Sequence, residues 1–269
     1  MKKLISILLV LLVLTSCKSY EVSNKSFDSS KEIVILYCNN KNANLKDIKN
    51  NEINNTPNVT FVSTGNITDI DLMNNFGLDY SCFGLKDFDK GLDSLYKNTC
   101  QAKYKYLLCS ASYNGQIKDY FKKTAPYEIV NYDGIKVAYI GVLSPRYVET
   151  NPNYFIEGDN IVVNFYNETE EVFYDTVECS IEKAIDKGAD YIVIISNFDD
   201  DEKYSPYSLK DLISNLSYVD VVINGNDYSN LKEAVLKNKD NRDVIVVSNG
   251  IHVGKITIKD NSIQNNSLD

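Results

Sequence analysis

The stretch TEEVFYDTVECSIEKAIDKGADYIVIISN, Thr169 to Asn197, determines the fold class. Its apolar residues first recur at steps of three and four, which predicts an amphipathic helix over Thr169–Lys187; they are Phe173, Val177, Ile181, Ala184 and Ile185. Gly188 then supplies the residue type that commonly ends a helix. The apolar run Tyr191–Ser196 has the length of a buried strand. A helix that leads directly into a buried strand is the unit of an α/β protein.

The rest of the chain repeats this alternation. Further strands are predicted at Ile33–Cys38, Val59–Ser63, Asp79–Gly84, Tyr104–Ser110, Val219–Asn224, Val244–Ser248 and His252–Lys259. Further helices are predicted at Asp69–Phe76, Asp87–Lys97 and Leu209–Leu216. The pair Asp133-Gly134, between the apolar runs Tyr127–Asn131 and Ile135–Val142, predicts a tight hairpin. These elements together predict an α/β fold with mixed sheets.

No repeat or internal linker divides this pattern, so we expect one domain over residues 32–260. The Asn- and Lys-rich stretch that precedes Pro57 is expected to be a loop. Residues 261–269 are expected to be a polar, frayed tail.

The first 31 residues are expected to lie outside the domain. Met1-Lys2-Lys3 followed by the apolar run Leu4–Leu14 has the order of a secretion signal, and the run is shorter than the ~20 residues that span a bilayer. Leu14 to Cys17 resembles the bacterial lipobox, whose cysteine becomes lipidated. We therefore expect a lipoprotein signal peptide at 1–16, acyl chains such as palmitate on Cys17, and a flexible tether over 17–31. This predicts a cell-envelope location, with membrane lipid as partner and the domain outside the cytoplasm.

Charge and rare residues limit the function classes. The formal net charge is −9, and loss of Lys2 and Lys3 with the signal makes it −11, which argues against nucleic-acid binding. Five cysteines follow Cys17, with no zinc spacing, and we interpret them mainly as small buried side chains; they are Cys38, Cys82, Cys100, Cys109 and Cys179. The chain has one histidine, His252, interpreted as a packed or surface residue.

Short motifs follow the strands in a recognisable order. They are Cys38-Asn39-Asn40-Lys41-Asn42-Ala43, Gly65-Asn66, Met73-Asn74-Asn75, Gly77-Leu78-Asp79, Gly84 to Gly91, Gly134 to Gly141, Lys187 to Asp190 with Ser196-Asn197, Gly225-Asn226-Asp227-Tyr228 and Gly254-Lys255-Ile256. In order and spacing they resemble the N-terminal domain of the 5′-nucleotidase and UDP-sugar hydrolase group of calcineurin-like metallophosphoesterases. The resemblance covers about Glu32 to Lys259. It implies a four-layer α/β/β/α sandwich of two mixed sheets flanked by helices.

The resemblance also implies a site for two divalent metal ions at the strand ends, and the matching positions have lost its chemistry. In chain order the family has Asp, His, a bridging Asp, a ligand Asn, a catalytic His and three further His. This chain has Asn40, Asn42, Asn66, Leu85, Lys86, Asn197, Asn226 and Tyr228 there. Two such ions need charged or imidazole ligands. At an effective dielectric of ~20, the ammonium of Lys86 would repel a unit positive charge ~4 Å away by about 4 kcal/mol.

We therefore expect no catalytic residue, no metal and no other cofactor, and a pseudoenzyme that binds a small anionic ligand or a protein partner. Lys86 is the candidate anion-binding residue. The alternative is a residual metal-dependent phosphoesterase or 5′-nucleotidase with one ion held by Asp87, Asp199 or Asp227, and a structural spacer is a third hypothesis. We interpret the acidic run that begins at Asp199 as a solvated loop, because it lacks EF-hand spacing. The family's separate nucleobase-binding domain is expected to be missing.

Overall fold

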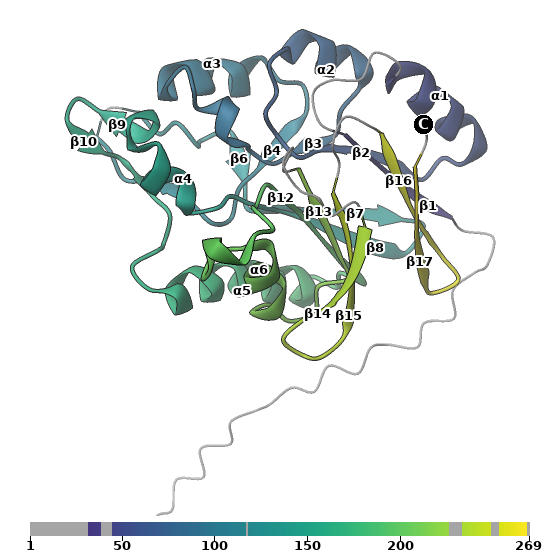
Figure 1. Ribbon diagram of the computed structural model, residues 1–269. Helices are drawn as coiled ribbons and strands as arrows, with labels where there is room; N and C mark the ends of the chain where they lie inside the picture. The colour runs from purple at the N-terminus through teal and green to yellow at the C-terminus, as the bar shows by residue number, and fades with distance from the viewer. Residues whose placement is uncertain (1–31, 39–44, 117, 226–232, 249–252, 268–269) are drawn as a thin grey trace, which may run out of the picture.

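The computed structural model describes residues 32–38, 45–116, 118–225, 233–248 and 253–267. Two large sheets lie face to face, and helices cover their outer sides (Figure 1). The helices are α1 (Leu45–Asn55), α2 (Ile70–Phe76), α3 (Leu92–Gln101), α4 (Arg146–Thr150), α5 (Glu170–Asp186) and α6 (Leu209–Ser214). Short 3₁₀ turns are η1 (Leu85–Asp87), η2 (Pro152–Phe155) and η3 (Glu202–Tyr204).

Sheet I has seven strands in the order β17-β16-β1-β2-β3-β4-β6. Its mutually parallel series consists of β1 (Ile33–Cys38), β2 (Val59–Ser63), β3 (Tyr80–Ser81), β4 (Lys105–Leu107) and β6 (Thr124–Ala125). β16 (Gly254–Lys259) pairs antiparallel with β1, and β17 (Ser262–Ser267) pairs antiparallel with β16. Sheet I is therefore mixed, as the sequence predicts.

Sheet II has six strands in the order β14-β15-β13-β12-β8-β7. Its parallel strands are β8 (Ile135–Val142), β12 (Tyr191–Ser196), β13 (Val221–Asn224) and β15 (Asp243–Ser248). The edge strands β7 (Tyr127–Tyr132) and β14 (Glu233–Lys237) run antiparallel to their neighbours. Two small sheets pair β9 (Ile156–Glu157) with β10 (Asn160–Ile161), and β5 (Ser112–Tyr113) with β11 (Val163–Asn164).

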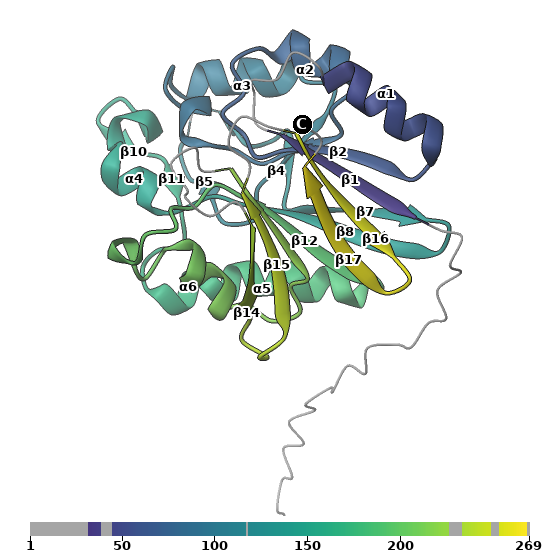
Figure 2. The same cartoon turned by 45° about the vertical axis from the view of Figure 1, so that its right-hand side comes forward.

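Three apolar layers hold the four structural layers together. Alternate residues of β1 point to opposite faces, so Val34 packs under α1–α3 whereas Ile35 packs between the sheets. Sheet II divides in the same way, because Ile194 packs against α5 and α6 and Val193 packs toward sheet I. Figure 2 shows the same stacking after a turn about the vertical axis. The expected four-layer sandwich is confirmed.

Local signals located several elements correctly. α5 begins after Thr169, whose side-chain oxygen accepts a hydrogen bond from the backbone N–H of Val172. The β7–β8 hairpin turns at Asp133 and Gly134, both at positive φ (51° and 101°), which is the geometry that Asp-Gly favours.

Three predictions were wrong in detail. The expected loop before Pro57 contains α1, which tertiary contacts stabilise: Glu52 forms a part-buried ion pair with Lys255 at 2.7 Å. The expected frayed tail contains β17, which is held by backbone pairing to β16. The predicted helix Asp87–Lys97 is split into η1 and α3 by Gly91, which adopts φ 79°.

Candidate functional site

The carboxyl ends of strands from both sheets meet at one place, which we call the strand-end site. The side-chain amide of Asn197, which follows β12, donates from Nδ2 to the carbonyl of Thr64 after β2, at 3.3 Å. It also approaches the carbonyl of Gly225 after β13, at 3.4 Å. Ligand sites of α/β proteins commonly form outside the carboxyl ends of parallel strands. The geometry therefore places Asn197 at the position where such a site would form.

The rest of the Asn197 amide is also engaged. Tyr147 of α4 donates its hydroxyl to Asn197, with Oδ1 at 3.0 Å and the backbone carbonyl at 2.9 Å. Asn197 is 7% exposed, and burial raises the pKa of Tyr147 well above its usual range, so the phenol remains a donor. Both halves of this amide therefore connect protein groups of different elements.

Asn224, the last residue of β13, forms a second buried connection. Its Oδ1 accepts hydrogen bonds from the Ser196 hydroxyl at 3.1 Å and from the Phe198 N–H at 2.7 Å. Its Nδ2 donates to the Phe198 carbonyl at 2.8 Å. These bonds fix the backbone that leaves β12 and hence the direction of Asn197.

Asn66 lies in the turn after β2, at a positive φ of 58° that asparagine adopts more readily than most residues. Its Oδ1 accepts a hydrogen bond from the backbone N–H of Lys86 at 3.0 Å. Gly65 before it has φ 91°, and a Cβ there would lie 2.2 Å from the backbone nitrogen of Gly84. The loops after β2 and β3 are thus in direct contact, and only glycine fits at position 65.

Asp87 holds the same two loops together from the inside. Its Oδ2 accepts from the N–H groups of Asn66 (2.7 Å) and Gly84 (2.8 Å), and its Oδ1 accepts from that of Ile67 (2.9 Å). Burial raises the pKa of Asp87 to about 7, although these N–H groups favour the ionised form and oppose the shift. Both carboxyl oxygens are therefore committed to the backbone, which argues against Asp87 as a ligand of a single metal ion.

The structure brings together four of the positions expected at the degenerate site. Asn66, Leu85 and Lys86 lie on the contacting loops after β2 and β3, and Asn197 contacts the β2 end through Thr64. The Leu85 side chain is half-buried and that of Lys86 is exposed. Asn40, Asn42, Asn226, Tyr228, Asp227, His252 and Cys17 lie outside the described residues.

The side chains at these four positions do not fit a pair of divalent cations. They offer neutral amides that already bond to protein groups, one hydrocarbon and one ammonium, and none delivers a negative charge or an imidazole nitrogen. Within the described ranges, no group of three or more His, Cys, Asp and Glu side chains is placed to hold a metal ion. Asp199 is half-buried beyond β12, and Asp201 pairs with Lys203 at 2.7 Å.

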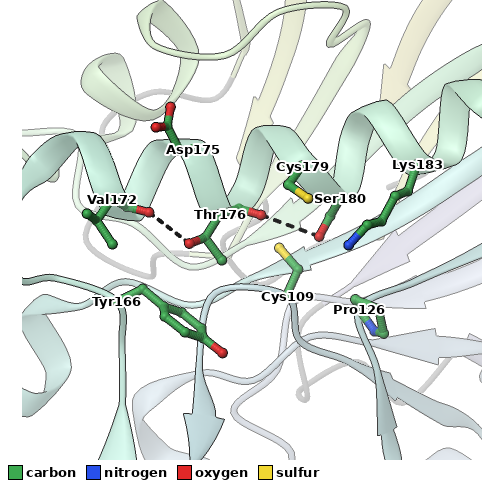
Figure 3. Close-up of a pocket in the computed structure, with 9 residues that line it drawn as sticks. All are labelled: Cys109, Pro126, Tyr166, Val172, Asp175, Thr176, Cys179, Ser180 and Lys183. Atoms are coloured by element: carbon green, nitrogen blue, oxygen red, sulfur yellow. Dashed lines mark hydrogen bonds between the residues drawn. The ribbon is translucent and has the colours of Figure 1, made fainter.

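A second concave region lies along α5, away from the strand-end site (Figure 3). It is an open pocket of about 520 Å³, lined by Cys109, Pro126, Tyr166, Val172, Asp175, Thr176, Cys179, Ser180 and Lys183.

Cys38, Cys82 and Cys109 are buried, as expected, whereas Cys100 and Cys179 are exposed. Burial raises the pKa of the Cys109 thiol to about 12, which makes it a poor nucleophile.

Sequence reasoning missed Tyr147, Asn224 and Thr64. Tyr147 lies in the short helix α4, which no periodicity indicates, and its contact with Asn197 joins residues 50 positions apart. Asn224 could be recognised only as the polar residue that ends an apolar strand.

Among the described residues, no helix is both long enough and apolar enough to cross a membrane.

Solved structures provide the comparison with known proteins. A 5′-nucleotidase precursor from Thermus thermophilus superposes with a TM-score of 0.69 at 17% identity, over 88% of this chain and 54% of that one. The NAD nucleotidase NadN of Haemophilus influenzae gives 0.67 at 18% identity, over 89% of this chain and 49% of that one. The calcineurin-like phosphoesterase YfkN of Bacillus subtilis gives 0.63 at 17% identity, over 88% and 90%.

This chain thus spans about half the length of the first two of these proteins. Its sequence matches no protein-family model and no curated protein sequence. At these identities the likeness establishes the fold.

Proposed function

We propose that this chain, which has the fold of the metallophosphoesterases and 5′-nucleotidases, is a membrane-anchored binding protein whose two-metal site has been replaced by hydrogen bonds within the protein. Asn197 is the observation that carries the proposal. A metal-binding imidazole directs a lone pair at the ion, whereas the Asn197 amide joins β12 to the ends of β2 and β13 and to Tyr147. Without the ions, water is not activated as a nucleophile.

The ligand of the strand-end site is a small anion in this proposal. Lys86 supplies an exposed ammonium beside the Asn66 turn, at the rim where the two loops meet. A lysine ammonium binds phosphate or carboxylate as a point charge, without a metal. Cys17, acylated after removal of the signal, holds the protein at a bacterial membrane through a tether and keeps the domain outside the cytoplasm.

Metal analysis of the purified processed protein tests the loss of two-metal chemistry. We expect transition metal well below one ion per chain after dialysis against manganese or zinc, and no phosphatase turnover with manganese or cobalt. Stoichiometric metal, with turnover that a chelator abolishes, would overturn the proposal in favour of a residual phosphoesterase.

Calorimetry tests the anion site. Nucleoside monophosphates and phosphosugars are titrated into the native protein, into Lys86→Gln and into Lys90→Gln, an exposed lysine four residues away. We expect binding by the native protein and Lys90→Gln, and at least a tenfold loss of affinity in Lys86→Gln. Equal affinity in the two variants, or no heat with the native protein, would remove Lys86 from the proposal.

A further inference from the structure

The ammonium of Lys118 lies against two tyrosine rings, and a third tyrosine ring packs against one of these two. The Lys118 Nζ lies 4.4 Å from the ring centroid of Tyr96 and 4.9 Å from that of Tyr120. The Tyr120 ring meets Tyr96 at 83° and Tyr113 at 85°, with centroids 6.4 and 5.3 Å apart. We call Tyr96, Tyr113 and Tyr120 the tyrosine cage. Rings at right angles present several faces to one cation, as in sites that recognise quaternary ammonium groups.

Elements distant in sequence fix the cage. Tyr96 is on α3, Tyr113 is on β5, and Tyr120 follows in the connection to β6. The Tyr113 hydroxyl donates to Glu157 of β9 at 2.7 Å and accepts from the backbone N–H of Lys118 at 3.1 Å. A Cβ at Gly115 would lie 2.4 Å from the Tyr113 hydroxyl, so glycine gives this ring its place. Tyr120 is 4% exposed.

The cage gives the Lys118 ammonium few hydrogen-bond acceptors. Its ammonium has three N–H donors, but among the described residues it makes one hydrogen bond, to Asp93 Oδ1 at 2.7 Å. Its other neighbours are ring faces, which attract positive charge but accept hydrogen bonds poorly. The side chains of Lys118 and Asp93 are 35% and 74% exposed, so solvent screens their ion pair. Replacement of the Lys118 ammonium by another cation beside Asp93 therefore costs little free energy.

The charged groups around the cage favour a cation between its rings. The carboxylates of Asp93, Asp119 and Glu157 and the ammonium of Lys118 act electrostatically on its rings. The ammonium of Lys97 acts on Asp93. Three carboxylates therefore favour a positive charge between the rings. A cation without N–H donors, such as a quaternary ammonium, would use the ring faces without leaving donors unpaired.

We propose that the tyrosine cage is a binding site for a small, soluble organic cation with a quaternary ammonium head, and that Lys118 occupies the cage as an internal competitor. The ligand displaces Lys118 and keeps Asp93 as its counter-ion. The ligand binds only those molecules in which Lys118 has left the cage, so its apparent affinity for the native protein is the intrinsic affinity multiplied by their fraction.

Calorimetry with choline, tetramethylammonium and the uncharged choline isostere 3,3-dimethylbutan-1-ol tests the site. Lys118→Gln empties the cage of its ammonium and is expected to bind choline at least tenfold more tightly than the native protein. Lys123→Gln, the same charge change at an exposed neighbour, is expected to match the native protein. Adding Tyr120→Leu to Lys118→Gln is expected to abolish the gain, and the isostere is expected to bind none of the proteins.

Several outcomes would overturn the proposal. They are equal choline affinity in Lys118→Gln and the native protein, an equal gain in Lys123→Gln, and binding of the isostere as tight as that of choline. A footprint on the unaltered protein gives a test that needs no variant. Choline is expected to raise the acetylation rate of Lys118 several-fold and leave that of Lys123 unchanged; equal rates with and without choline would contradict displacement.

Discussion

Replacement of Asn197 by alanine tests how the strand-end site is held. The change removes the amide that bonds to the Thr64 and Gly225 carbonyls and accepts from Tyr147. Two buried carbonyls lose a donor, while Tyr147 keeps the backbone carbonyl of residue 197. A lost buried hydrogen bond costs roughly 1–3 kcal/mol, and the lengths of 3.3 and 3.4 Å favour the lower half of that range for each bond. We expect a total loss of about 2 kcal/mol in the free energy of unfolding.

Urea unfolding followed by circular dichroism measures this loss. A domain of this size loses roughly 2–4 °C in melting temperature per kcal/mol, so calorimetry should show a decrease of about 4–8 °C. Asn160→Ala, at an exposed position on β10, is the control and is expected to stay within about 0.5 kcal/mol of the native protein. If Asn197→Ala were as stable as this control, the amide would not be a structural connection. A loss that appeared only in the presence of manganese or zinc would instead identify a metal ligand.

Three further predictions concern other parts of the chain. Burial raises the pKa of Asp220 to about 6, so its contribution to stability is complete below pH 4 and is lost as pH rises through 6. Relative to Asp220→Asn, the free energy of unfolding of the native protein in urea titrations should fall by at most about 3 kcal/mol from pH 4 to 7. A difference between the two proteins that stays constant with pH would contradict the shift. Gly65→Ala should cost more than about 2 kcal/mol, because a Cβ there meets backbone at 2.2 Å, whereas Gly158→Ala, also at positive φ but in open space, should cost only about 1 kcal/mol in the same assay. Cys17→Ser should abolish labelling by a palmitate analogue and release the protein from membranes on fractionation; retained label would place the lipid elsewhere.

The parts of the fold that the sequence predicts are those with strong local signals. The period of α5 and the Asp133-Gly134 turn need no distant contact to be recognised. α1 is different, because its Asn- and Lys-rich sequence is typical of a loop. Its Ile48 packs on the core and its Glu52 pairs with Lys255 across 203 positions, and this packing outweighs the weak intrinsic preference.

The sequence predicts which residues lie at the candidate site, but it does not predict their hydrogen-bond partners. The family resemblance identified Asn66, Lys86 and Asn197 as the matching positions at strand ends. It did not indicate that Asn66 accepts from the Lys86 backbone or that Asn197 contacts Tyr147, since these contacts depend on how α4 and the loops pack. The tyrosine cage likewise joins residues of α3, β5 and the connection to β6 that no motif connects.

Hydrogen bonds within the protein hold the strand-end loops of both sheets together. Here the Asp87 carboxylate accepts three backbone N–H groups, and the amides of Asn197 and Asn224 join the ends of β2, β12 and β13. The apolar layers that stabilise the sandwich involve other residues, such as Ile35 and Val193 between the sheets. Because the apolar layers do not include the strand-end side chains, the architecture does not identify the chemistry of the site, and function must be argued from the site itself.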